Sequence, residues 1–131
     1  MSKHIYKPQQ FEVNEAWILF QLNEDPVLTE EDGDFNVFAL MDAASFYILY
    51  TEFVKIDSLE PLETESKRLL KNGYSQKEEY PKMIFIPTNQ SASIFSKEAE
   101  LLDIVIVRIP EQELHVYIDD ARNALREHLN E

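Results

Sequence analysis

The clearest hydrophobic pattern lies in the second half of the chain. Residues 83–86, Met-Ile-Phe-Ile, and residues 104–107, Ile-Val-Ile-Val, are uninterrupted apolar runs. Between them Phe95, Ala99 and Leu102 recur at helical spacing. Uninterrupted apolar strands are typical of parallel sheets that are covered on both faces. The pattern therefore predicts a strand, helix, strand unit with two parallel strands.

Two further strands are predicted nearer the N-terminus. Residues 17–22 and 35–41 are apolar runs rich in residue types that favour strands. The stretch 23–34, which contains Pro and Gly among many carboxylates, is an acidic loop that joins them. Residues 1–10 are polar and expected to be flexible, and the length suits one core, so residues 1–131 are expected to form a single domain.

Residues 42–56 allow two interpretations. Asp42 could cap a helix, but most of residues 46–54 are aromatic or β-branched and favour a strand. We favour a hairpin that turns at residues 42–45 and continues into a third strand. Because apolar side chains occur on both of its alternating faces, we expect this strand to be covered on both sides.

Two more helices flank the parallel unit. The first begins at Ser58 and ends where Gly73 offers a left-handed cap, followed by a loop over residues 74–81. The helix inside the parallel unit, between residues 83–86 and 104–107, can be capped by Thr88 or Ser91. Leucines share one face of the first helix: Leu59, Leu62, Leu69 and Leu70. A last helix after Pro110 has one apolar face: Leu114, Tyr117, Ile118, Ala121, Leu125 and Leu129.

These elements predict an α/β fold. We expect a mixed sheet of about five strands, with antiparallel strands first and the parallel unit second, flanked by helices. No repeat or low-complexity tract interrupts the order.

Charge then narrows the range of partners. Twelve basic residues stand against 25 acidic ones, which gives a net charge of −13, and residues 8–54 contain no Lys or Arg. Such a field repels phosphate backbones, so direct nucleic-acid binding is not expected. It would instead suit an acidic decoy that binds a basic protein. The basic cluster Lys67, Arg68 and Lys71 has several glutamates around it and is interpreted as a solvated, salt-bridged face. These glutamates are Glu60, Glu63, Glu65, Glu78 and Glu79.

Several kinds of chemistry lack the residues they need. The absence of Cys excludes disulfides, thiolate metal sites and a cysteine nucleophile. Two glycines are too few for a glycine-rich phosphate loop. The three histidines are too far apart in sequence to share a metal, and the acidic loop lacks the ligand spacing of a calcium-binding EF-hand. We therefore expect no metal site and no cofactor. Without a signal peptide or membrane-spanning run, the expected location is the cytoplasm, with no membrane partner.

The polar loop after residues 83–86 is the best-placed candidate binding site. It contains Thr88, Asn89, Gln90 and Ser91. In open α/β sheets, ligands gather beyond the carboxyl ends of strands, where a helix start offers free N–H groups. A small anion would suit such a site. The alternative is that Thr88 and Ser91 only cap the helix.

A further candidate is Asp42. The stretch Leu-Met-Asp-Ala-Ala-Ser-Phe-Tyr-Ile-Leu-Tyr, residues 40–50, resembles the start of ribonuclease H-like domains of the transposase and integrase type, and the succession of elements also resembles that fold. The resemblance implies three acidic residues holding two divalent metals for phosphodiester chemistry. Asp42 matches the first position, Thr88 and Asn89 stand uncharged at the second, and Asp119 or Asp120 could serve as the third.

The position of Asp42 depends on the direction of its strand. If residues 35–41 ran parallel to residues 83–86, Asp42 would lie at the same sheet edge as Thr88 and Asn89. Otherwise Asp42 is a turn-forming or capping residue.

Three functions follow from these patterns. The first is a non-catalytic α/β module that binds another protein or forms a homodimer, supported by the many aromatic residues over residues 35–53. Two-fold self-association is the default, since such dimers are the commonest. The second is a metal-dependent ribonuclease H-like nuclease, active or degenerate. The third is the acidic decoy.

Overall fold

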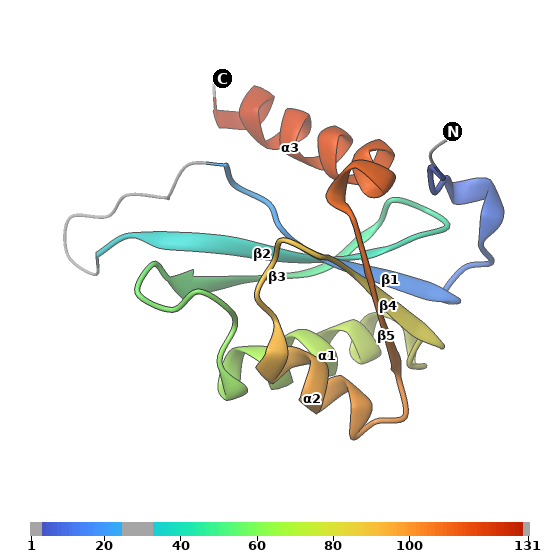
Figure 1. The fold of residues 1–131 in the computed structure, drawn as a ribbon, viewed down its shortest axis with the longest axis horizontal. Coiled ribbons are helices and arrows are strands. Elements are labelled where there is room, and N and C mark those ends of the chain that lie inside the picture. The colour runs from blue at the N-terminus through green and yellow to red at the C-terminus, as the bar shows by residue number, and fades with distance from the viewer. Residues whose placement is uncertain (1–3, 25–32, 130–131) are drawn as a thin grey trace.

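The protein is built around one five-stranded sheet with helices on both faces (Figure 1). The computed structural model describes residues 4–24 and 33–129. The strands are β1 (Ala16–Gln21), β2 (Phe35–Asp42), β3 (Ile48–Lys55), β4 (Met83–Pro87) and β5 (Val105–Ile109). The helices are α1 (Glu63–Lys77), α2 (Ser93–Glu100) and α3 (His115–Leu129), with short 3-10 helices η1 (Pro8–Gln10) and η2 (Glu111–Leu114). The predicted α/β fold and order of elements are confirmed.

The sheet is mixed, as predicted. Its strand order is β3-β2-β1-β4-β5. β2 lies antiparallel to β1 and to β3, whereas β4 lies parallel to β1 and to β5. The predicted strand, helix, strand unit is β4, α2 and β5.

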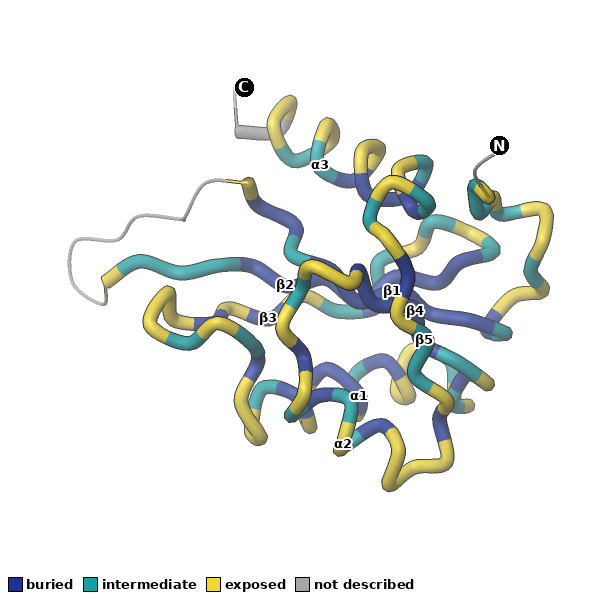
Figure 2. Tube along the Cα trace, viewed as in Figure 1, coloured by how far each residue is buried: buried dark blue, intermediate teal, exposed yellow. Residues whose placement is uncertain are grey.

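The central strand β1 is buried on both faces. Residues 16–20 have no exposed surface, and Figure 2 shows the strand in the buried middle of the sheet. Trp17 and Leu19 face the core under α1 and α2, whereas Ile18 and Phe20 face the core under α3. Alternate side chains of a strand point to opposite faces, so one apolar strand supplies both cores.

The two edge strands correct part of the sequence analysis. β3 and the strand near residue 106 were expected to be covered on both sides, but they form the two edges of the sheet. Phe53 in β3 is 55% exposed and Val105 in β5 is 60% exposed. An apolar run favours a strand but does not determine where the strand lies in the sheet, and at an edge the flanking helices leave some of its side chains exposed, so this prediction was wrong.

Helix α1 begins and ends later than predicted. Leu59 is 78% exposed and precedes the helix, whose first turn is closed by the N–H of Leu62 donating to Oε1 of Glu65 at 2.7 Å. At the other end, α1 continues to Lys77, and Glu78 adopts the left-handed conformation with φ of 58°. The predicted cap at Gly73 is therefore wrong, and the loop predicted over residues 74–81 begins only after Lys77.

Gly73 lies inside the helix because of packing. A Cβ atom at this position would lie 2.8 Å from Cζ3 of Trp17 and 3.0 Å from Cδ2 of Leu40. Both neighbours are fully buried. The missing side chain therefore lets α1 lie directly on the Trp17 ring in the middle of the sheet.

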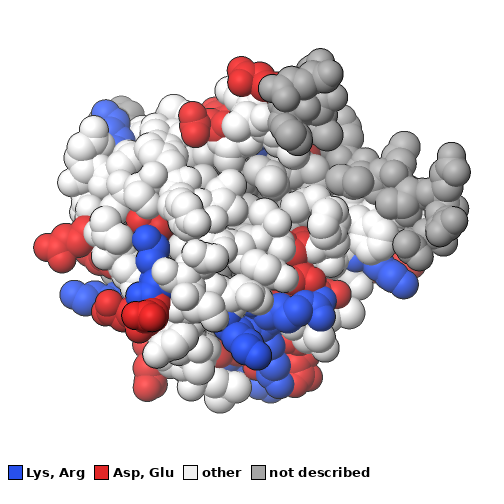
Figure 3. Space-filling model, turned by 180° about the vertical axis from the view of Figure 1, so that it is seen from behind, with Lys and Arg blue, Asp and Glu red and all other residues white. Residues whose placement is uncertain are grey.

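The salt-bridged surface is confirmed for two of its basic residues. Nζ of Lys67 lies 2.6 Å from Glu63, and Arg68 makes a 2.6 Å ion pair with Glu52 of β3. The hydrogen bonds that Arg68 donates to the buried carboxylate of Glu52 raise the pKa of Arg68 above its usual value. Figure 3 shows the same mixture on one face of the molecule, where Lys and Arg side chains lie beside Asp and Glu side chains.

We predict that Gly73→Ala destabilises the protein. Alanine improves helix propensity by about 1 kcal/mol, but overpacking a filled core costs about 1–3 kcal/mol. Because Trp17 and Leu40 are enclosed, the net result should be a lower free energy of unfolding in urea titration. Gln76→Ala, at an exposed position of the same helix, is the control and should not lose stability. Equal stability of the Gly73→Ala variant and the parent would contradict this packing.

Candidate functional site

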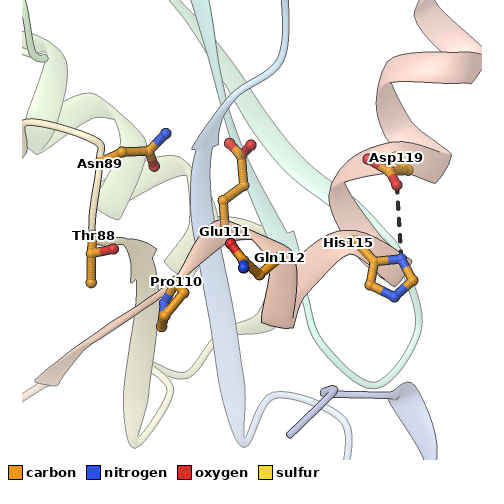
Figure 4. A pocket seen from close by; sticks show the side chains of 7 residues that line it. All are labelled: Thr88, Asn89, Pro110, Glu111, Gln112, His115 and Asp119. Carbon is orange, nitrogen blue, oxygen red and sulfur yellow. Dashed lines mark ion pairs between the residues drawn. The ribbon is translucent and has the colours of Figure 1, made fainter. Parts of the chain in front are cut away.

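The candidate site is a polar hollow where the parallel strands end. The chain leaves β4 through Thr88 and Asn89 and leaves β5 through Pro110 into η2. Both segments therefore lie at the same end of the sheet, beyond the carboxyl ends of these two strands. The hollow has a volume of about 400 Å³. Its lining, drawn in Figure 4, is Thr88, Asn89, Pro110, Glu111, Gln112, His115 and Asp119.

The loop after β4 is held to β5 by hydrogen bonds. The N–H of Thr88 donates to the carbonyl of Ile109 at 2.9 Å. Nη2 of Arg108 donates to the carbonyl of Pro87 at 3.0 Å and also to that of Gln90. Three hydrogen bonds thereby tie the two segments together, so this wall of the hollow is fixed by the sheet.

A second hollow of about 330 Å³ adjoins the first and shares Asn89 and Glu111 with it. Gln90 and Arg122 also line it. Nη2 of Arg122 donates to the carbonyl of Gln21 at 2.9 Å and lies 3.4 Å from Oε1 of Glu111. Arg122 therefore links the end of β1 to η2.

The cationic groups at this edge already have partners within the chain. Arg108 and Arg122 donate to carbonyl oxygens, and Arg126 pairs with Glu24. Nδ1 of His115 lies 3.8 Å from Asp119, which is an ion pair only when the histidine is protonated. The arrangement can offer hydrogen bonds to a ligand, but its charges are largely balanced internally.

The start of α2 is occupied by a carboxylate of the chain itself. Oε1 of Glu60 accepts from the N–H of Ile94 at 2.7 Å and from Oγ of Ser93 at 3.1 Å. Thr88 and Ser91 make no cap hydrogen bond at this helix, so the predicted capping role is wrong. Glu60 supplies the negative charge that a helix N-terminus favours.

The structure brings together part of the predicted site. Thr88, Asn89 and Asp119 line the first hollow, and Gln90 lines the second. Ser91 lines neither, and its carbonyl accepts from the side chain of Gln90 at 2.8 Å. Asp120 is exposed on α3 and lines neither hollow.

Sequence analysis missed the second wall of the site. Pro110, Glu111, Gln112 and His115 contribute it. The rule that predicted the loop after β4 also applies to the segment after β5, because the carboxyl ends of parallel strands meet at one edge. The signal was present, but it was used for one strand only.

Asp42 lies at the opposite end of the strands from this hollow. Because β2 runs antiparallel to β1 and β1 runs parallel to β4, the end of β2 lies beside the start of β1, where Asp42 pairs with Trp17. The condition under which Asp42 would lie beside Thr88 and Asn89, a β2 strand parallel to β4, is therefore not met. The three positions implied by the ribonuclease H-like resemblance do not come together.

The fully buried carboxylate of Asp42 is part of a hydrogen-bond network. Its Oδ1 accepts from the N–H of Asn14 at 2.8 Å and its Oδ2 accepts from Oγ of Ser45 at 2.6 Å. The side chain of Asn14 continues the network, because its Oδ1 accepts from Nε1 of Trp17 at 2.6 Å and its Nδ2 donates to the carbonyl of Glu79 at 3.2 Å. Asp42 thus connects the β2–β3 hairpin to β1 and to the segment before β4.

In the part of the chain that the structure describes, no three His, Asp or Glu side chains lie close enough to hold a metal ion. Residues 25–32 of the acidic loop over residues 23–34 lie outside the described residues. No described helix is long and apolar enough to cross a membrane.

The sequence matches no family model and no curated protein. Among solved structures, the chain is similar to a chain in the cryo-EM structure of the simian T-cell lymphotropic virus intasome in complex with PP2A regulatory subunit B56 gamma. The TM-score is 0.50 with 15% sequence identity over 88% of this chain. The match spans 45% of that chain, less than half of its length. At this identity the likeness shows the fold alone.

We predict that Asp42 is needed for stability. Asp42→Ala leaves the N–H of Asn14 and the hydroxyl of Ser45 without their acceptor, which should lower the free energy of unfolding by about 2–4 kcal/mol. Asp42→Asn keeps an acceptor and should lose less than half as much. Chemical denaturation of the three proteins gives the comparison. An alanine variant as stable as the parent would refute the structural role.

Near Asp42 lies another buried polar group, the hydroxyl of Tyr117. The hydroxyl of Tyr117 has no hydrogen bond among the described residues, and its ring packs 5.2 Å from that of Phe46. Burial, and then the nearby negative charge of Asp42, raise the pKa of Tyr117 above its usual value. The folded state therefore binds this proton more tightly than the unfolded state does.

The sign of the resulting pH dependence follows. Below the pKa of an unfolded tyrosine, about 10, both states keep this proton and stability does not depend on it; above that pH the unfolded state loses the proton first and folding becomes less favourable. Tyr117→Phe should therefore be at least as stable as the parent near neutral pH and should lose less stability at about pH 10–11. Urea titrations at both pH values, with the exposed Tyr74→Phe as control, test this. A parent-like alkaline loss in the Tyr117→Phe variant would contradict it.

Proposed function

We propose that this chain is a non-catalytic α/β module that associates with a second copy of itself through the free edge of β5. The observation that carries the proposal is the exposed apolar surface at this edge. Val105 at the start of β5 is 60% exposed, and Leu101 in the turn before it is 71% exposed. Leu102, in the same turn, is 38% exposed, and exposed apolar side chains at neighbouring positions are a feature of interaction sites.

The backbone of β5 is also available for pairing. The N–H of Val105 donates to the carbonyl of Lys82, and the carbonyl of Ile109 accepts from Thr88. In a parallel ladder, residues that bond the neighbouring strand alternate with residues that point away from it. The N–H and C=O groups of Ile106 and Arg108 therefore point away from β4, toward the open edge.

The only charged side chain of β5 does not block this edge. Arg108 turns back onto the carbonyls of Pro87 and Gln90. Edge strands that avoid pairing commonly carry exposed charges, lysine above all. β3, at the other edge, has Lys55 with its backbone directed outward and an exposed side chain.

Charge favours β5 as the place where two copies meet. Two chains of net charge −13 repel each other, and β5 contains no carboxylate. A stable contact usually buries about 800 Å² on each partner, which is more than a five-residue strand offers. The neighbouring Leu101 and Leu102 supply further apolar surface, so the proposed contact consists of the strand together with this turn.

The proposal also covers nucleic-acid binding, location and a secondary ligand site. The acidic surface gives no support to direct nucleic-acid binding, and a cytoplasmic location suits a cysteine-free chain. The hollow lined by Thr88 and Asn89 is proposed as a secondary ligand site, since both side chains face it and neither caps α2.

The test compares proline at the two sheet edges. Ile106→Pro removes an N–H that none of the described strands uses, so the fold should persist while pairing is lost. Light scattering after size exclusion should give twice 15.4 kDa for the parent and 15.4 kDa for the variant. Thr51→Pro, at an outward-facing position of β3, should remain a dimer.

A second variant covers the case in which proline disturbs the strand. Val105→Lys changes an exposed side chain and should weaken association while leaving circular dichroism unchanged. A monomeric parent at high concentration would contradict the proposal. So would loss of the dimer in Thr51→Pro with retention in Ile106→Pro.

A further inference from the structure

We infer that the second copy lies antiparallel along β5 with Val107 opposite its own counterpart on the two-fold axis, joining the two sheets into one. The inference rests on the proposed self-association and specifies its register. The register is inferred from the backbone N–H and C=O groups of β5 that point away from β4.

Both ends of the free edge are closed. The N–H of Ile104, just before β5, already donates to the carbonyl of Ala99 at 3.1 Å. Just after β5, Pro110 has no N–H to donate. Between these limits, the outward-facing donors are the N–H groups of Ile106 and Arg108, which lie symmetrically on either side of Val107.

Only one two-fold register pairs all four outward groups of these two residues. With Val107 on the axis, the N–H and C=O of Ile106 meet the C=O and N–H of Arg108 in the second copy. With Ile106 on the axis, Arg108 faces Ile104, whose N–H is committed, so the carbonyl of Arg108 has no donor. With Arg108 on the axis, Ile106 faces Pro110 and its carbonyl has no donor.

The side chains suit the same register. Two Val107 side chains would meet directly, and Val105 would lie opposite Ile109 of the second copy. These residues are all apolar, and Val107 and Ile109 belong to the core on the α3 face. The register therefore extends that core across the interface and covers the exposed Val105.

A single cysteine tests the register, because the chain has none of its own. In an antiparallel pair, residues between the hydrogen-bonded positions have Cα atoms about 4.5 Å apart, a distance that a disulfide spans. Val107→Cys should give nearly complete disulfide-linked dimer under mild oxidation. Val105→Cys, although more exposed, should stay unlinked because its two copies would lie about four residues apart along the strands.

The outcomes separate the register from the association itself. A dimeric Val107→Cys variant that does not crosslink, or preferential crosslinking of Val105→Cys, would overturn the register while the self-association stands. A monomeric protein in light scattering would overturn both. Mixing Val105→Cys with Ile109→Cys should give a linked heterodimer, and its absence alongside linked Val107→Cys would also contradict the register.

Discussion

The complete burial of β1 is the constraint on which the rest of the structure depends. Residues 16–20 have no contact with water and carry apolar side chains on both faces. Helices must therefore cover the sheet on both sides, and strands must flank β1 on both sides to satisfy its backbone. α1 approaches the Trp17 ring closely enough that Gly73 can carry no side chain without a shift. The layers follow from this one apolar strand.

The two ends of the sheet have different roles. At the end where β1 begins, Asp42, Asn14 and Trp17 form a buried hydrogen-bond network that joins the hairpin to the central strand. At the other end, polar side chains line hollows and the arginines are held by carbonyl oxygens. A carboxylate that could have suggested catalysis is thus part of the scaffold, and no three His, Asp or Glu side chains among the described residues lie close enough to hold a metal ion.

The elements were predictable from sequence, but their neighbours were not. Runs of apolar and strand-favouring residues identified the strands, yet a run such as residues 104–107 has the same composition at an edge as in the centre of a sheet. A glycine in a helical pattern can mark either the end of a helix or a close packing contact, and at Gly73 the sequence does not distinguish the two. The cap of α2 comes from Glu60, 33 residues before Ser93, so local spacing could not reveal it. The rule that ligands bind beyond the carboxyl ends of parallel strands predicted the loop after β4, which is one wall of the polar hollow. The position of Asp42 depended on the direction of β2, which the apolar pattern of residues 35–41 does not indicate.

The free edge of β5 connects this architecture to function, because an edge strand with unused backbone groups can take another strand. Amide hydrogen exchange across a range of protein concentrations tests this most directly. We predict that the N–H groups of Val105 and Val107, which face β4, stay protected throughout, whereas those of Ile106 and Arg108 are protected at high concentration and exchange rapidly on dilution. Rapid exchange of Ile106 and Arg108 at every concentration would contradict the account.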